Sequence, residues 1–255
     1  MDIRKIIAVA NQKGGVGKTT TAGALIAGLS NENFRVLGID LDPQGNLSDS
    51  CGAEMYRMPT IYELLKNEAA LGDVIQTMEG FDVIPSNIML AGAEQELSQT
   101  GKEHRLKEKI LPVAGNYDYI VIDTPPSLGV LTINAFTFAD EIIIPTTTGI
   151  FAVNGIRQLN ATVENVRKYC NPNVKIRGIL LTKFNPRTNI GKQIRELTTQ
   201  LSHHINAPIF ETFIRNGVAV EEAQANRTDI FTYSGKSTVS EDYKAFINEY
   251  LKGVN

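Results

Sequence analysis

The segment NQKGGVGKTT (residues 11–20) decides the fold of this 255-residue chain. It follows a short apolar run at residues 6–10 and precedes a helix-forming stretch that reaches residue 31. A strand, a glycine-rich loop and a helix in this order form a phosphate cradle, because the loop N–H groups and the helix N-terminus attract anions. We expect Lys18 to reach the β and γ phosphates of a nucleotide and Thr19 to ligate Mg²⁺, although Gln12 stands where the general pattern has its first glycine. The predicted cradle consists of Gly14, Gly15, Val16, Gly17, Lys18, Thr19 and Thr20.

Short β-branched runs alternate with longer helical stretches along almost the whole chain. This alternation is typical of a mostly parallel, twisted sheet with helices on both faces. We expect an α/β fold of the P-loop NTPase type with about seven or eight strands, and one domain over residues 1–255. The predicted strands lie near residues 5–10, 35–40, 81–85, 119–123, 141–145, 175–181 and 208–212. The predicted helices lie near residues 18–31, 61–66, 91–97, 102–110, 130–138, 153–169, 190–204, 218–225 and 240–252.

The composition excludes several classes of protein. The two cysteines, Cys51 and Cys170, are too few for a four-thiolate metal site and favour a reducing compartment over a secreted, disulfide-bonded scaffold. No window of the sequence approaches the ~18 consecutive apolar residues that cross a bilayer. We therefore expect a cytoplasmic protein without a membrane span.

Carboxylates follow two of the predicted strands. Asp40 and Asp42 end one strand and Asp123 ends another. The carboxyl ends of parallel strands meet at one edge of the sheet, and a buried acid there needs a cationic partner. Mg²⁺ beside a triphosphate is such a partner, so we predict a magnesium site formed by Thr19, Asp40 and Asp123.

Basic residues concentrate between Arg167 and Arg215. This segment holds nine Lys or Arg residues against two acidic ones, in a chain whose net charge is −3. Such a local excess is typical of a surface that binds a polyanion, but a solvated basic surface has the same charge count.

Three strings resemble the ParA/MinD family of ATPases with a deviant Walker A motif: KGGVGKTT (residues 13–20), DLDPQGN (40–46) and DTPP (123–126). The resemblance implies ATP and Mg²⁺ as cofactors. It also implies that Lys13 crosses a dimer interface to touch the phosphates bound by the other subunit. By the same resemblance Asp42 orients the attacking water, Asp123 is the Walker B acid and Asp40 supports the magnesium shell. Lys13, Lys18 and Asp42 are thus the predicted catalytic residues.

Two further strings resemble the small, Soj-type ParA proteins: LLTKFNPRTNIGKQI (residues 180–194) and FETFIRNGVAVEEA (210–223). The first implies that the backbone at Asn185 and Pro186 approaches the adenine. The two strings together imply DNA contacts by Arg187 and Arg215, although the proline that precedes the arginine in the family is missing before Arg215. The predicted DNA-binding residues, all inside the basic segment, are Arg187, Lys192, Arg195 and Arg215.

The resemblance implies a partition ATPase that dimerises on ATP, binds double-stranded DNA without sequence preference and hydrolyses ATP slowly. A ParB-like centromere-binding partner would accelerate hydrolysis, and its basic N-terminal segment would meet the acidic first half of this chain. The implied location is the bacterial cytoplasm, on the nucleoid and not on a membrane. The identity of the cargo and the oligomeric state without nucleotide stay open.

Other functions on the same core make different demands. A MinD-like membrane-cycling ATPase, or another cargo-positioning ATPase, is the main alternative. Membrane cycling needs a basic amphipathic C-terminal helix, whereas the polar face near residues 240–252 carries more acidic than basic residues, which favours docking on the sheet. An iron–sulfur reductase needs cysteines from each subunit around a cluster, and an ATP-dependent ligase needs a second substrate pocket.

Overall fold

The described residues of the computed structural model, 5–97, 100–147 and 152–253, form one seven-stranded sheet. Its strand order is β3-β4-β2-β5-β1-β6-β7, and β3 alone runs antiparallel to its neighbour. The mostly parallel sheet predicted from the sequence is thus confirmed. The strands are β1 (Lys5–Val9), β2 (Val36–Asp40), β3 (Gln76–Thr77), β4 (Asp82–Ile84), β5 (Tyr119–Asp123), β6 (Glu141–Thr146) and β7 (Lys175–Leu181).

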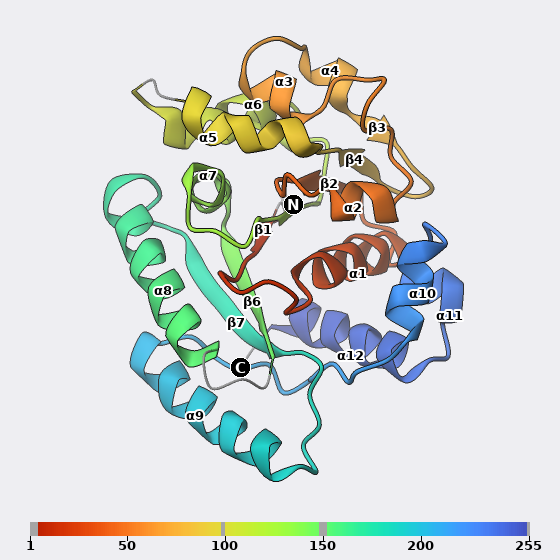
Figure 1. Cartoon of the computed structure of the whole chain (residues 1–255), viewed down its shortest axis with the longest axis vertical. Coiled ribbons are helices and arrows are strands. Elements are labelled where there is room, and N and C mark those ends of the chain that lie inside the picture. Colours follow the sequence, from red (N-terminus) through yellow and green to blue (C-terminus); the bar gives the residue numbers. More distant parts are fainter. Residues whose placement is uncertain (1–4, 98–99, 148–151, 254–255) are drawn as a thin grey trace.

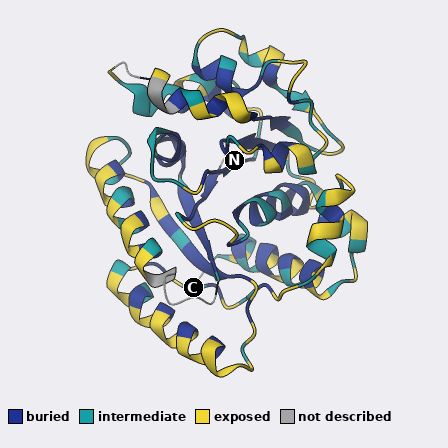
Figure 2. Cartoon of the chain, viewed as in Figure 1, coloured by how far each residue is buried: buried dark blue, intermediate teal, exposed yellow. Residues whose placement is uncertain are grey.

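Helices cover both faces of the sheet (Figure 1). Successive side chains of a strand point to opposite faces, so Ile6 and Ala8 of β1 join one apolar core while Ile7 and Val9 join the other. Figure 2 shows the sheet buried between the two helical layers. The helices are α1 (Lys18–Asn31), α2 (Asn46–Ser50), α3 (Ile61–Leu65), α4 (Leu71–Val74), α5 (Ala93–Glu96), α6 (Arg105–Ala114), α7 (Val130–Phe138), α8 (Ala152–Tyr169), α9 (Asn189–Ile205), α10 (Ala219–Ala225), α11 (Ile230–Ser234) and α12 (Thr238–Lys252), with 3-10 helices η1 (Ile88–Gly92) and η2 (Lys102–His104).

The predicted strand at 208–212 is wrong. This segment forms a single bridge, between Ile179 and Ile209, instead of a ladder. Pro208 has no N–H to donate, and the Glu249 carboxylate accepts hydrogen bonds from the backbone N–H groups of Glu211 (2.6 Å) and Thr212 (2.9 Å). The short elements β3, α2, α4 and α11 were not predicted, because they are too brief to show a period.

The C-terminal helix α12 docks on the sheet, as its acidic polar face predicts. Its apolar residues Tyr243, Phe246, Ile247 and Tyr250 are buried in the core that also contains α1. At its end the Tyr250 hydroxyl donates a 2.9 Å hydrogen bond to a Glu141 carboxylate oxygen. Among the described helices, none has both the length and the apolar character needed to cross a bilayer.

Candidate functional site

The glycine-rich loop joins the carboxyl end of β1 to the N-terminus of α1. Gly15 (φ 72°) and Gly17 (φ 82°) adopt the left-handed conformation that glycine tolerates best. A Cβ atom added at Gly14 or Gly15 would meet nothing within 4 Å. Packing within the chain therefore does not require a glycine at position 14, whereas the close approach of a phosphate chain would.

Hydrogen bonds to neighbouring strands hold this loop in place. The Asn11 amide donates to the Pro145 carbonyl (2.7 Å) and accepts from the backbone N–H of Lys13 (3.0 Å). The Thr182 hydroxyl donates to the Val16 carbonyl at 2.8 Å. Sequence reasoning missed both residues, although each follows a predicted strand at the edge where ligands bind.

Lys18 is buried at the first position of α1, with 6% of its surface exposed. Its Nζ donates to the Lys13 carbonyl at 3.3 Å. Burial lowers the pKa of Lys18, while the nearby carboxylates of Asp123 and Asp42 act in the opposite direction. Lys18 therefore lies among carboxylates and beside the glycine-rich loop, which is a suitable position for contacting a polyphosphate.

Asp123, at the end of β5, is fully buried. The Thr19 hydroxyl lies near this carboxylate, but neither oxygen makes a hydrogen bond of normal geometry with a described residue. Burial, then the charge of Asp40, raises the pKa of Asp123 well above its usual range, and the Thr19 hydroxyl and Lys18 only partly oppose this. The structure thus brings Lys18, Thr19, Asp40, Asp42 and Asp123 close together and leaves one buried carboxylate that a cation would satisfy.

The acidic residue that ends β2 and the one in the turn after it have different surroundings. Asp40 lies directly across from Asp123 in the register of β2 and β5, and its oxygens accept hydrogen bonds from Ser48 and from the backbone N–H of Asp42. Asp42 is 7% exposed, and its Oδ1 accepts from the backbone N–H of Gln44 at 3.0 Å. In the described part of the chain, no three His, Cys, Asp or Glu side chains converge as metal ligands. A metal ion here would therefore depend on phosphate and water oxygens, as Mg²⁺ usually does.

Asn185 and Pro186 lie in the loop between β7 and α9. The Asn185 side chain accepts from the backbone N–H of Arg187 (3.0 Å), and its carbonyl accepts from the Thr188 hydroxyl (3.0 Å). A Cβ atom at Gly191 would clash with the Asn185 carbonyl, so this glycine lets the loop close on α9. The loop begins at Thr182, which contacts the phosphate loop, and this places it at the same edge of the sheet.

Four of the nine basic residues of this segment are neutralised by partners from outside it. Arg167 pairs with Glu164, Lys175 and Arg177 pair with Glu141, and Arg215 pairs with Asp242. Five exposed cations of the segment have no ion pair with another described residue. Lys168 lies on α8, and the other four lie together on the loop before α9 and on α9 itself: Lys183, Arg187, Lys192 and Arg195.

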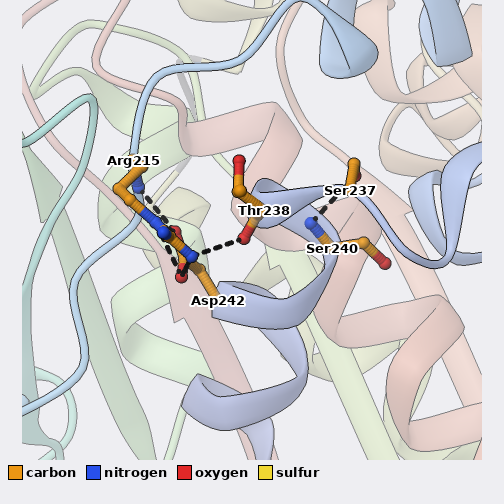
Figure 3. Close-up of polar contacts among 5 residues, drawn as sticks. All are labelled: Arg215, Ser237, Thr238, Ser240 and Asp242. Carbon is orange, nitrogen blue, oxygen red and sulfur yellow. Dashed lines mark hydrogen bonds and ion pairs between the residues drawn. The ribbon is translucent and has the colours of Figure 1, made fainter.

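Arg215 is held by the first turns of α12 (Figure 3). Its Nη2 lies 2.7 Å from Asp242 Oδ1 and its Nε lies 2.9 Å from Asp242 Oδ2. Its backbone N–H donates to the same carboxylate at 2.9 Å, and Nη2 also reaches the Thr238 carbonyl at 3.3 Å. The predicted DNA contact by Arg215 stays a prediction, since in this conformation Asp242 occupies the guanidinium.

The two cysteines lie on opposite sides of the sheet. Cys51 packs against the core under α1, and Cys170 packs against the other core. Cys51 also lines a cavity of about 340 Å³ beside α1, and burial raises the pKa of its thiol to about 12. One chain therefore cannot direct both thiols at one iron–sulfur cluster.

Comparisons with known proteins agree with this geometry. A family model described as an AAA domain matches residues 4–176. The sporulation initiation inhibitor protein Soj of Bacillus subtilis is 43% identical over 94% of this chain and 95% of its own length. The chromosome partitioning protein ParA of Myxococcus xanthus is 39% identical over 98% of this chain and 89% of its own.

Among solved structures, a cobyrinic acid a,c-diamide synthase from Mycobacterium smegmatis, with bound ATP analogue and magnesium, superposes with a TM-score of 0.84. It is 33% identical, and the match covers 98% of this chain and 95% of that one. The family model covers residues 4–176, and the relatives cover nearly the full length of the chain. The chain therefore belongs to the ParA/MinD type of P-loop ATPases, together with the Soj and ParA partition proteins.

Proposed function

We propose that this chain, as a single domain, is a partition ATPase that binds ATP and Mg²⁺, dimerises on ATP and then binds DNA without sequence preference. The observation that carries the nucleotide part is the buried, unpartnered Asp123 carboxylate beside Lys18 and Thr19. The relatives named Soj and ParA support the assignment to DNA partition.

Each residue at this edge of the sheet would have a separate role in phosphoryl transfer. When bound, Mg²⁺ neutralises charge on the phosphates. Thr19 and Asp123 would hold it, Lys18 would contact the β and γ phosphates, and Asp42 would orient the attacking water. Since transfer of a loose phosphoryl group requires mainly positioning and charge neutralisation, this set suffices for slow hydrolysis.

Lys13 is the residue that would make dimerisation depend on bound nucleotide. Its side chain is exposed at the entrance of the loop, while its backbone is fixed by Asn11 and Lys18. A lysine in this position can reach across an interface toward phosphates bound by a second copy. Lys13→Ala should therefore abolish ATP-dependent dimerisation, which light scattering after gel filtration measures.

The proposed DNA surface is the exposed side of α9 and the loop before it. Arg187, Lys192 and Arg195 carry charges that no described acidic residue neutralises. Such side chains bind phosphates without reading sequence. Because the loop that carries Arg187 starts at Thr182, which contacts the phosphate loop, a change at the nucleotide can be passed to this surface.

Membrane cycling has less support than DNA binding. The apolar face of α12, which would have to enter a bilayer, is buried on the sheet. We further propose a nucleoid location and a ParB-like partner whose basic segment meets the acidic first half of the chain.

The test is a titration of random-sequence DNA at fixed moderate salt with ATP, ADP or no nucleotide. Wild type should bind only with ATP, and Lys13→Ala should not bind under any condition. Equal affinity in all three conditions would contradict the coupling of nucleotide to DNA. Binding to anionic liposomes in place of DNA would support the membrane-cycling alternative.

A further inference from the structure

A chain of hydrogen bonds links the carboxyl ends of two strands through Ser48. The Asp40 Oδ2 accepts from both the backbone N–H (2.9 Å) and the hydroxyl (2.7 Å) of Ser48. The Ser48 hydroxyl oxygen in turn accepts from the backbone N–H of Ser86, which follows β4, at 2.9 Å. All three residues are fully buried, so each bond forms away from water, where a missing partner is costly.

The other oxygen of Asp40 fixes the turn that carries Asp42. Asp40 Oδ1 accepts from the backbone N–H of Asp42 at 3.0 Å. The turn then closes through two further bonds, from the N–H of Gln44 to Asp42 Oδ1 (3.0 Å) and from the N–H of Gly45 to the Asp42 carbonyl (2.9 Å). The position of Asp42 thus depends on Asp40, and the orientation of Asp40 depends on Ser48.

The same bonds separate the roles of the two carboxylates that face each other across β2 and β5. Asp40 has three donors on its two oxygens, whereas only the Thr19 hydroxyl approaches Asp123, without a hydrogen bond of normal geometry. A carboxylate already engaged by three donors is a poor metal ligand, and an unpartnered one is a good ligand.

We propose that Ser48 is a positioning residue for ATP hydrolysis: through Asp40 it holds the turn that presents Asp42, and Asp40 supports this turn instead of ligating the metal. This rests on the proposed ATPase function. Nothing in the sequence pattern marks Ser48, because it acts through a residue eight positions earlier in the chain.

The experiment compares Ser48→Ala with Ser50→Ala. Ser50 lies in the same short helix, but its hydroxyl donates to the Leu47 carbonyl and not to Asp40. We expect Ser48→Ala to lower kcat by about tenfold or more with KM for ATP changed less than about threefold, since one charge-assisted hydrogen bond is lost. Ser50→Ala should keep the wild-type kcat. Equal kcat for the two variants would overturn the proposal.

Two further measurements separate positioning from loss of folding. In the Asp42→Ala background, Ser48→Ala should add no further loss, because both act at one step. Asp40→Asn should lower kcat without raising the Mg²⁺ concentration for half-maximal activity, whereas Asp123→Asn should raise it. An increased Mg²⁺ requirement in Asp40→Asn would overturn the proposal even if Ser48→Ala fails to fold.

The activity of the wild type distinguishes failure of the role of Ser48 from failure of the proposed ATPase function. If wild type hydrolyses ATP and Ser48→Ala matches it, the role of Ser48 alone fails. If wild type shows neither ATP binding nor hydrolysis, the proposed function fails and the role of Ser48 fails with it.

Discussion

The nucleotide edge of the sheet and the exposed side of α9 are built in opposite ways. At the edge, charged side chains are buried, close together and hydrogen-bonded to backbone groups of the neighbouring loops and of α2. On α9 the charges are exposed and have no ion pair with another described residue. A buried charge contacts its ligand from one fixed position, whereas several exposed charges attract a polyanion by their sum. The first site should therefore respond sharply to single substitutions, and the second should respond gradually.

The largest effect is expected from Lys18→Ala. This change removes a buried cation that we propose contacts the phosphates, at a position where electrostatic interactions are strong. ATP turnover should fall by about 100-fold or more, measured as phosphate release. Lys192→Ala, which removes an exposed lysine on α9, is the matched control and should retain turnover within about twofold. Comparable losses in the two variants would erase the distinction between the two regions.

The next largest effect concerns DNA. The triple variant Arg187→Ala/Lys192→Ala/Arg195→Ala should weaken ATP-dependent DNA binding by about tenfold or more and reduce the salt dependence by about one counterion per residue. Lys236→Ala/Lys252→Ala removes exposed charges elsewhere and should leave the slope unchanged. If the salt dependence of DNA binding changed only with the number of basic residues removed, and not with their position, α9 would not be the contact surface.

Asp123→Asn should separate function from stability. Because burial raises the pKa of Asp123 in the folded state, its ionised form costs stability as the pH rises above the unfolded value. The variant should melt about 2 to 5 °C higher than wild type without nucleotide, an effect of about 1 to 2 kcal/mol.

The gain in Asp123→Asn should be larger at pH 8 than at pH 5, because the cost of the raised pKa grows as the pH rises above the unfolded value. Mg²⁺ with ATP should raise the melting temperature of wild type more than that of the variant. Scanning calorimetry at both pH values checks this, and a lower melting temperature for the variant without nucleotide would argue against an unsatisfied charge at Asp123.

The smallest effect is expected from Arg215→Ala. Asp242 already neutralises this arginine, so its removal should change the salt slope of DNA binding less than Arg187→Ala does. The pair is partly exposed, so the melting temperature should fall by only about 1 to 3 °C. A loss of DNA affinity equal to that of Arg187→Ala would mean that Arg215 leaves Asp242 to contact DNA.

Sequence reasoning succeeded where neighbouring residues determine the structure. The strand, loop and helix around Lys18 are encoded within about 30 residues, so the motif fixed their arrangement. It failed where partners come from far along the chain. The bonds from Glu249 to residues 211 and 212 prevented the predicted strand, and Asp242 neutralised Arg215 from 27 residues away. A charge count over a segment cannot include partners outside that segment.

The separation of α9 from the nucleotide edge has an evolutionary consequence. Exposed residues such as Lys192 and Arg195 can be exchanged at a cost of about 0.5 kcal/mol or less, because little packs against them. Buried residues such as Asp40 and Lys18 allow almost no change. Proteins descended from one ancestor could therefore acquire different binding surfaces through a few substitutions on α9, while the nucleotide site is inherited unchanged.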